Sequence, residues 1–213
     1  MYWDANEVID LVTDSLQAQA DQDDLEQAVY GLDNQNELAL HQIIEQGLSK
    51  STFGVHREVR YPAAWEKTKK SEGFRCDFVL TPGRLPLRDP DHTATLFASQ
   101  NATEPHSAYW LEVKVTRQFD AGVRSNRYAH DLTHPVKADV LKIMQDPQLH
   151  HAALLLILFT QDQRAAERDL MLWHDLQLKN NNPVSLPLIR GFKITDRIGN
   201  AWCAPALYRI HQP

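Results

Sequence analysis

Lysine and arginine are absent from the first 49 residues, although this segment contains eleven acidic residues. All 22 basic residues therefore lie in residues 50–213, where they outnumber the acidic residues and give a net charge of +5. The formal charge of the whole chain, −6, would argue against a nucleic-acid partner if it were spread evenly. Because the two signs are segregated, residues 50–213 remain able to bind a polyanion.

Cysteine and long apolar runs are also scarce, and both scarcities restrict the class of protein. Cys76 and Cys203 are the only cysteines, which excludes a disulfide framework and a Cys-X-X-Cys metal site. The longest apolar run, residues 152–159, has eight residues, whereas a transmembrane helix needs roughly 20. The first residues lack the basic region of a signal peptide. We expect a cytoplasmic protein without a membrane segment.

The pattern of apolar residues predicts an α/β fold in two parts, an acidic helical N-terminal extension over residues 1–31 and a domain over residues 32–213. Apolar stripes at helical spacing predict helices over residues 4–19, 23–30, 34–48, 135–146 and 163–178. Alternating or continuous apolar runs predict strands over residues 53–61, 74–80, 107–116, 152–159, 188–195 and 202–210. A polar segment, residues 81–106, is predicted to be a long loop between two neighbouring strands.

The strand predicted over residues 107–116 carries an acid and a lysine on one face. Glu112 and Lys114 point to the same side because side chains alternate along a strand, and they lie roughly 7 Å apart. In the strand over residues 74–80, the apolar side chains of Phe74, Cys76, Phe78 and Leu80 are expected on one face. Asp77 is then expected on the other face, together with Arg75. The three residues Asp77, Glu112 and Lys114 form a candidate catalytic group.

The order helix, strand, strand, strand, helix, strand between Asn34 and Phe159, with Asp77 and Glu112-Val113-Lys114 on the second and third strands, resembles the PD-(D/E)XK nuclease superfamily. The resemblance implies a restriction-endonuclease-like core, a central mixed sheet flanked by helices in the order αβββαβ. Cys76 stands where this family usually has proline, a replacement that the family tolerates.

The resemblance also implies a site and a chemistry. Asp77, Glu112 and the Val113 carbonyl would bind Mg²⁺, for which Mn²⁺ can substitute, and Lys114 would orient the attacking water or stabilise charge in the transition state. An acid on the first helix of the core often joins such a site, and Glu37 is the first candidate. His41 and Glu45 are alternatives, and Glu37 could instead close a capping box with Asn34.

The implied partner is nucleic acid, DNA rather than RNA. Basic residues near the two motif strands are the candidate contacts, although such clusters are often only solvated surface: Lys67, Lys69, Lys70, Arg117, Arg124, Arg127 and Lys137. On the helix that follows the Glu-X-Lys strand, Lys137, Asp139 and Lys142 are three polar candidates among which the sequence does not choose.

Other functions compete with that of a metal-dependent nuclease. A catalytically inactive module with the same fold could bind nucleic acid or protein, and the acidic N-terminal segment could pack on the core, mediate self-association as a homodimer, or shield a nucleic-acid groove. A zinc site at His130 and His134 would need helical geometry at His134, which the following Pro135 disfavours.

Overall fold

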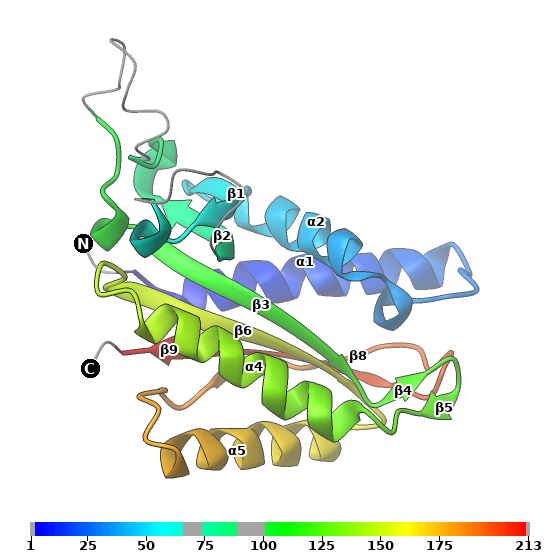
Figure 1. Ribbon diagram of the computed structural model, residues 1–213. Coiled ribbons are helices and arrows are strands. Elements are labelled where there is room, and N and C mark those ends of the chain that lie inside the picture. Colours follow the sequence, from blue (N-terminus) through cyan, green and yellow to red (C-terminus); the bar gives the residue numbers. More distant parts are fainter. Residues whose placement is uncertain (1–2, 66–73, 89–100, 212–213) are drawn as a thin grey trace.

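The computed structural model describes residues 3–65, 74–88 and 101–211. These residues form a central mixed β-sheet with helices on both of its faces (Figure 1), as the sequence predicts. The helices are α1 (Ala5–Leu25), α2 (Glu37–Leu48), α4 (Tyr128–Met144) and α5 (Gln163–Lys179). None of the helices in these residues combines the length and the apolar character that a membrane span requires.

The main sheet has the strand order β1-β2-β3-β6-β9-β7, and β8 also pairs with β9. Its strands are β1 (Gly54–Arg60), β2 (Arg75–Thr81), β3 (Tyr109–Arg117), β6 (His151–Thr160), β7 (Leu188–Ile189), β8 (Phe192–Lys193) and β9 (Trp202–Ile210). Strands β1, β2 and β3 form an antiparallel meander, and α4 makes the crossover that brings β6 parallel to β3. A separate hairpin, β4 (Phe119–Asp120) and β5 (Val123–Arg124), precedes α4.

Helices α1 and α2 cover one face of the sheet. The apolar stripe of α1, which includes Val8, Val12 and Leu16, is fully buried in the same hydrophobic core as Leu155 of β6 and Leu207 of β9. Residues 1–31 were predicted to be an acidic helical N-terminal extension. Within them, α1 lies beside α2 and its apolar stripe belongs to the core on this face of the sheet. The predicted second helix over residues 23–30 is absent, since α1 ends at Leu25 and turns follow.

The start of α2 also differs from the prediction. Asn36, not Asn34, caps the helix, and its side chain accepts a hydrogen bond from the Ala39 amide at 2.9 Å. Glu37 is therefore the first helical residue and not the third, so the capping-box explanation of Glu37 is wrong. The side chain of Glu37 is exposed and available for another role.

Helices α4 and α5 cover the other face of the sheet. Helix α4 begins at Tyr128, seven residues before the predicted start, and continues through residue 135. A proline within a helix removes one backbone donor, but tertiary contacts compensate here, since Leu132, Val136, Val140 and Ile143 are buried against the sheet. His130 and His134 consequently lie on consecutive turns of α4, with their rings stacked 4.4 Å apart.

Candidate metal and catalytic site

The site lies where β2 separates from β3. The two strands pair only from Phe78 to Leu80, which lie opposite Leu111 to Tyr109. Before Phe78 the ladder stops, and the side chain of Asp77 takes its place: Asp77 Oδ2 accepts a hydrogen bond from the Val113 amide at 2.7 Å. Asp77 is thereby held at the backbone of Val113, the residue that separates Glu112 from Lys114 on β3.

The predicted alternation of β2 fails at the same point. Phe78 and Leu80 face the core under α1 and α2, as expected, but Cys76 is buried in the core under α4 and α5. Phe74, which was predicted to lie on the same apolar face, is 62% exposed. Simple alternation cannot predict such an irregularity, because it arises from pairing with the neighbouring strands. Its consequence is that Asp77 sits at a break in the sheet, open to ligands from both layers.

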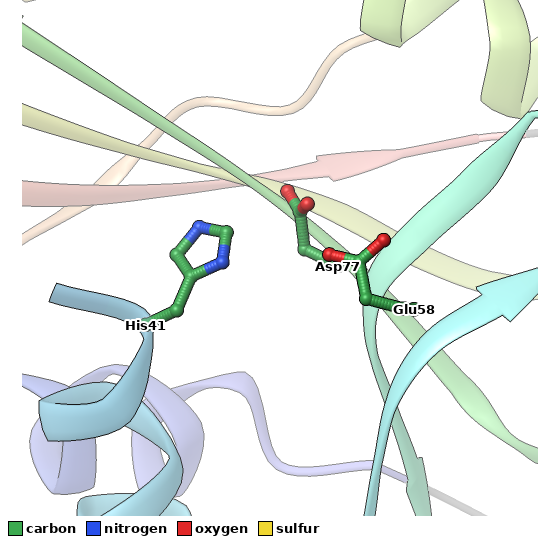
Figure 2. Close-up of side chains that lie close together, drawn as sticks. All are labelled: His41, Glu58 and Asp77. Atoms are coloured by element: carbon green, nitrogen blue, oxygen red, sulfur yellow. The ribbon is translucent and has the colours of Figure 1, made fainter. Parts of the chain in front are cut away.

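Glu58 on β1 lies beside this break. Its backbone has φ = 53°, the left-handed region that a side chain of this size rarely adopts. The regular pairs of β1 with β2 include Arg57 with Phe78 and Val59 with Cys76, and they omit Glu58 and Asp77. Strained backbone of this kind is concentrated at functional sites. Here it turns the Glu58 carboxylate toward Asp77 (Figure 2).

His41, Glu58 and Asp77 form the one group of three potential metal ligands found within the described residues. One ligand atom from each lies within 4.8 Å of the other two. His41 comes from α2 and is only 4% exposed, and Figure 2 shows its ring facing Asp77. Its Nε2 has no hydrogen-bond partner among the described residues, and Glu37 Oε1 lies 4.0 Å away. A buried nitrogen without a partner fits a ligand position, since buried polar groups are normally paired.

Glu112 is nearly completely buried, with 2% of its surface exposed. The hydroxyl of Tyr61 donates a hydrogen bond to Glu112 Oε1 at 2.5 Å. Burial, followed by the carboxylates of Asp77 and Asp139, raises the pKa of Glu112 to about 9. The hydrogen-bonding influence of Asp77 also raises the pKa of Glu112 and favours its protonated form. Divalent cations bind at such paired carboxylates in place of the proton.

Lys114 is held by Asp139 of α4. Lys114 Nζ lies 3.2 Å from Asp139 Oδ2, and Lys142 Nζ donates to Asp139 Oδ1 at 2.6 Å. Burial is the largest influence on the pKa of Lys114 and would lower it, but the surrounding carboxylates, Asp139 foremost, together outweigh burial and the pKa is raised. The charges of Asp77 and Glu37 act in the same direction. Lys114 is therefore a fixed cation beside the acidic group.

Most of the expected site residues thus converge. Asp77 interacts electrostatically with both Glu112 and Lys114, and Glu37 reaches the same region through His41 and the field that it exerts on Lys114. Val113 contributes its amide to Asp77, while its side chain is part of the core. Glu45, the other alternative on this helix, pairs with Arg57 at 3.3 Å.

The residues predicted to contact nucleic acid lie in different environments. Lys67, Lys69 and Lys70 lie outside the described residues. The guanidinium of Arg117 donates hydrogen bonds to the carbonyls of Asp33 and Gln35, so this side chain fixes the chain that leads into α2. The remaining three predicted contacts are exposed: Arg124 on β5, Arg127 before α4, where it pairs with Asp131 at 3.5 Å, and Lys137 on α4.

Glu58 and Tyr61 were not predicted to be part of the site, and Asp139 was only one of three candidates. Their contribution depends on contacts between elements far apart in the chain, such as the bond from Tyr61 to Glu112. The one local signal was the position of Asp139 three residues before Lys142, on a helix that follows the Glu-X-Lys strand.

Comparison of this chain with protein-family models, with curated proteins and with solved structures finds no match. The side chains themselves therefore have to indicate the function.

Proposed function

We propose that this protein is a metal-dependent nuclease that hydrolyses phosphodiester bonds in DNA. One observation carries the proposal: Asp77 is bound to the Val113 amide at the break between β2 and β3, next to the buried Glu112 and to Lys114, which Asp139 holds as a cation. The element order α2-β1-β2-β3-α4-β6 supports it, because this is the order that the resemblance to PD-(D/E)XK nucleases implies.

The donor set fits a divalent cation. Asp77 can bind it together with Glu112 on one side and with His41 and Glu58 on the other, since Asp77 belongs to both groups. Carboxylate oxygens suit Mg²⁺ and Mn²⁺, and an imidazole nitrogen shifts the preference toward Mn²⁺ and other transition ions. When bound, such an ion acidifies a water molecule and polarises the scissile phosphate.

The protein's own groups supply the rest of the chemistry. Lys114 stabilises the negative charge that develops on the phosphate, and Asp139 keeps its ammonium group in position. Tyr61 holds one oxygen of Glu112, which leaves the other oxygen for Asp77 or a cation. On the α2 side, Glu37 lies 4.0 Å from His41.

A cleavage experiment tests the proposal. Supercoiled plasmid, linear duplex, single-stranded DNA and RNA are incubated with the protein and Mn²⁺ or Mg²⁺. We expect Asp77→Asn to abolish cleavage and Lys114→Met to reduce it by about 10²- to 10³-fold, as for loss of one transition-state donor. Asp169→Asn is the matched control, because Asp169 is a buried carboxylate on α5 that hydrogen-bonds Tyr128.

Calorimetric titration with Mn²⁺ separates an enzyme from an inactive module of the same fold. Binding by the native protein that is lost in Asp77→Asn and kept in Asp169→Asn supports the site. If the folded native protein binds neither ion and cleaves none of the four substrates, the nuclease proposal fails.

A further inference from the structure

A small pocket adjoins the candidate site on the side of α4. It has a volume of about 190 Å³ and is lined by Tyr61, Phe74, Lys142 and Gln145, among others. Two of these residues connect it directly to the site. Tyr61 donates to Glu112, and Lys142 donates to the Asp139 carboxylate that also holds Lys114. A group in this pocket is therefore one side chain away from the acids and the lysine.

The pocket contains an aromatic ring that its surroundings leave open. Phe74 is 62% exposed, although Lys142 Nζ lies 5.1 Å from its ring centroid. The backbone of Phe74 is fixed, because its carbonyl accepts a hydrogen bond from the Tyr61 amide at 3.2 Å. Because the backbone holds this ring in an exposed position, a ligand that stacks on it buries apolar surface that is otherwise in contact with water. Phe74 thus has the properties of a stacking platform.

The size and polarity of the pocket restrict its ligand. Sites for drug-sized ligands measure about 300–1,000 Å³, so a pocket of 190 Å³ suits a single planar ring system. The Gln145 amide is exposed at the pocket and can both donate and accept hydrogen bonds, as the edge of a nucleobase requires. Lys142 adds a positive charge on the side that faces the catalytic acids. An aromatic face, an amide and a cation next to a phosphate site match one nucleotide.

We propose that this pocket binds an unpaired nucleobase of the substrate, next to the phosphate that is cleaved, and so selects single-stranded or frayed nucleic acid. The inference rests on the proposed function, since it takes the phosphate to lie at Asp77 and Glu112. A base inside a duplex has both faces covered by its neighbours and cannot stack on a side chain without leaving the helix. Phe74 is therefore the specificity-determining residue.

Binding of three labelled DNAs tests the pocket. A single-stranded 10-mer, the matching duplex, and the same single strand without its central bases are titrated by fluorescence anisotropy, with Ca²⁺ as the cation and their integrity checked on gels. We expect Phe74→Ala to weaken binding of the intact single strand by about 5- to 100-fold, the loss typical of one base-aromatic stack. Binding of the duplex and of the strand without central bases should change less than twofold, and Phe74→Trp should retain the affinity.

Tyr30→Ala is the matched control, because Tyr30 is 60% exposed and lies after α1. Equal affinity of the native protein and Phe74→Ala for the intact single strand would overturn the proposal of a base-binding pocket. An equal loss of affinity for all three DNAs would overturn it too. The two proposals fail separately. Loss of single-strand affinity only in Phe74→Ala, without cleavage by the native protein, supports the pocket and rejects the nuclease. Cleavage with no effect of Phe74→Ala on binding does the opposite.

Discussion

The two edges of β3 differ in how completely they are paired. Toward β6, all nine residues from Tyr109 to Arg117 have a partner in register. Toward β2, pairing is confined to residues 109–111, and polar side chains take over where it ends. The paired edge adjoins the buried apolar residues of β6, whereas the open edge adjoins Asp77, a half-buried acid. Glu112, a buried acid of β3 itself, lies beside Asp77.

This difference separates stability from chemistry within one strand. Apolar burial on the β6 side stabilises the fold, because each large side chain removed from water contributes about 1.5–3 kcal/mol. Buried acids on the β2 side cost free energy unless they are paired, hydrogen-bonded or protonated. The complete pairing of β3 with β6 holds the backbone of β3 in place, so the acids cannot move apart to reduce this cost. Substitutions on the two edges should therefore affect different measured quantities.

The largest effect on folding is expected at the paired edge. Leu155→Ala on β6 removes a fully buried side chain between the layers and should lower the free energy of unfolding by about 2–5 kcal/mol. Urea denaturation measures it. A loss below about 1 kcal/mol would mean that the site collapses around the cavity and that this edge is less rigid than its register indicates.

At the open edge, the stability should depend on pH. Burial raises the pKa of Glu112 from its ordinary value of 4.5 to about 9 in the folded protein, so the folded state binds one proton more than the unfolded state between these two values. The free energy of unfolding should then fall as the pH rises through this window, by up to about 1.4 kcal/mol per unit. Glu112→Gln, which cannot ionise, should remove this part of the slope.

Urea denaturation between pH 5 and 8 in the presence of a chelator compares the two proteins. Equal slopes for the native protein and Glu112→Gln would show that Glu112 is already ionised in the folded state, and the contrast between the edges would be lost.

A smaller change at the same edge should affect cation binding more than folding. Tyr61→Phe removes the hydroxyl that holds Glu112 Oε1 and leaves the ring, which stacks on Trp110 with a centroid separation of 5.7 Å. Groups that orient a metal ligand typically contribute 10- to 100-fold in affinity. We expect a loss of about this size for Mn²⁺ by calorimetry. Unchanged affinity would place the cation away from Glu112, on the side of His41 and Glu58.

The smallest effect is expected far from both edges. Asp10 of α1 pairs with Arg190 at 2.6 Å, but both side chains are partly exposed, at 51% and 37%. Asp10→Asn should change the free energy of unfolding by less than about 1 kcal/mol and leave cation binding unaltered. A larger loss in denaturation experiments would reveal a third stabilising region beyond the two edges of β3.

Local patterns in the sequence predict much of this molecule. The apolar run from Ala152 to Phe159 and the alternation around Glu112 specify the two central strands, because burial on both faces or on one face determines which side chains a strand can carry. The element order between α2 and β6 follows from the same periodicities. Glu112 and Lys114 could be identified for this reason, whereas Asp77 lies on a strand that was predicted although its alternation fails at Cys76.

The remaining parts depend on long-range contacts. The left-handed backbone of Glu58 has no local signal, and the change of face at Cys76 depends on where β2 leaves β3. Helix α4 starts early because buried contacts outweigh the residue at 135, which a propensity scale would treat as a helix start. The role of Arg117 as an anchor for two carbonyls required the position of the chain before α2.

Helix α1 lies against β9, and Asp10 meets Arg190, 180 residues further along the chain. During synthesis at 5–20 residues per second, α1 waits roughly 10–40 s before β9 leaves the ribosome. For that time the stripe of Val8, Val12 and Leu16 has α2 as its main neighbour and lacks its contacts with β7 and β9. The layer formed by α1 and α2 is thus completed late. Until β9 has been made, the nascent chain exposes the hydrophobic face of α1 to chaperones and to other chains.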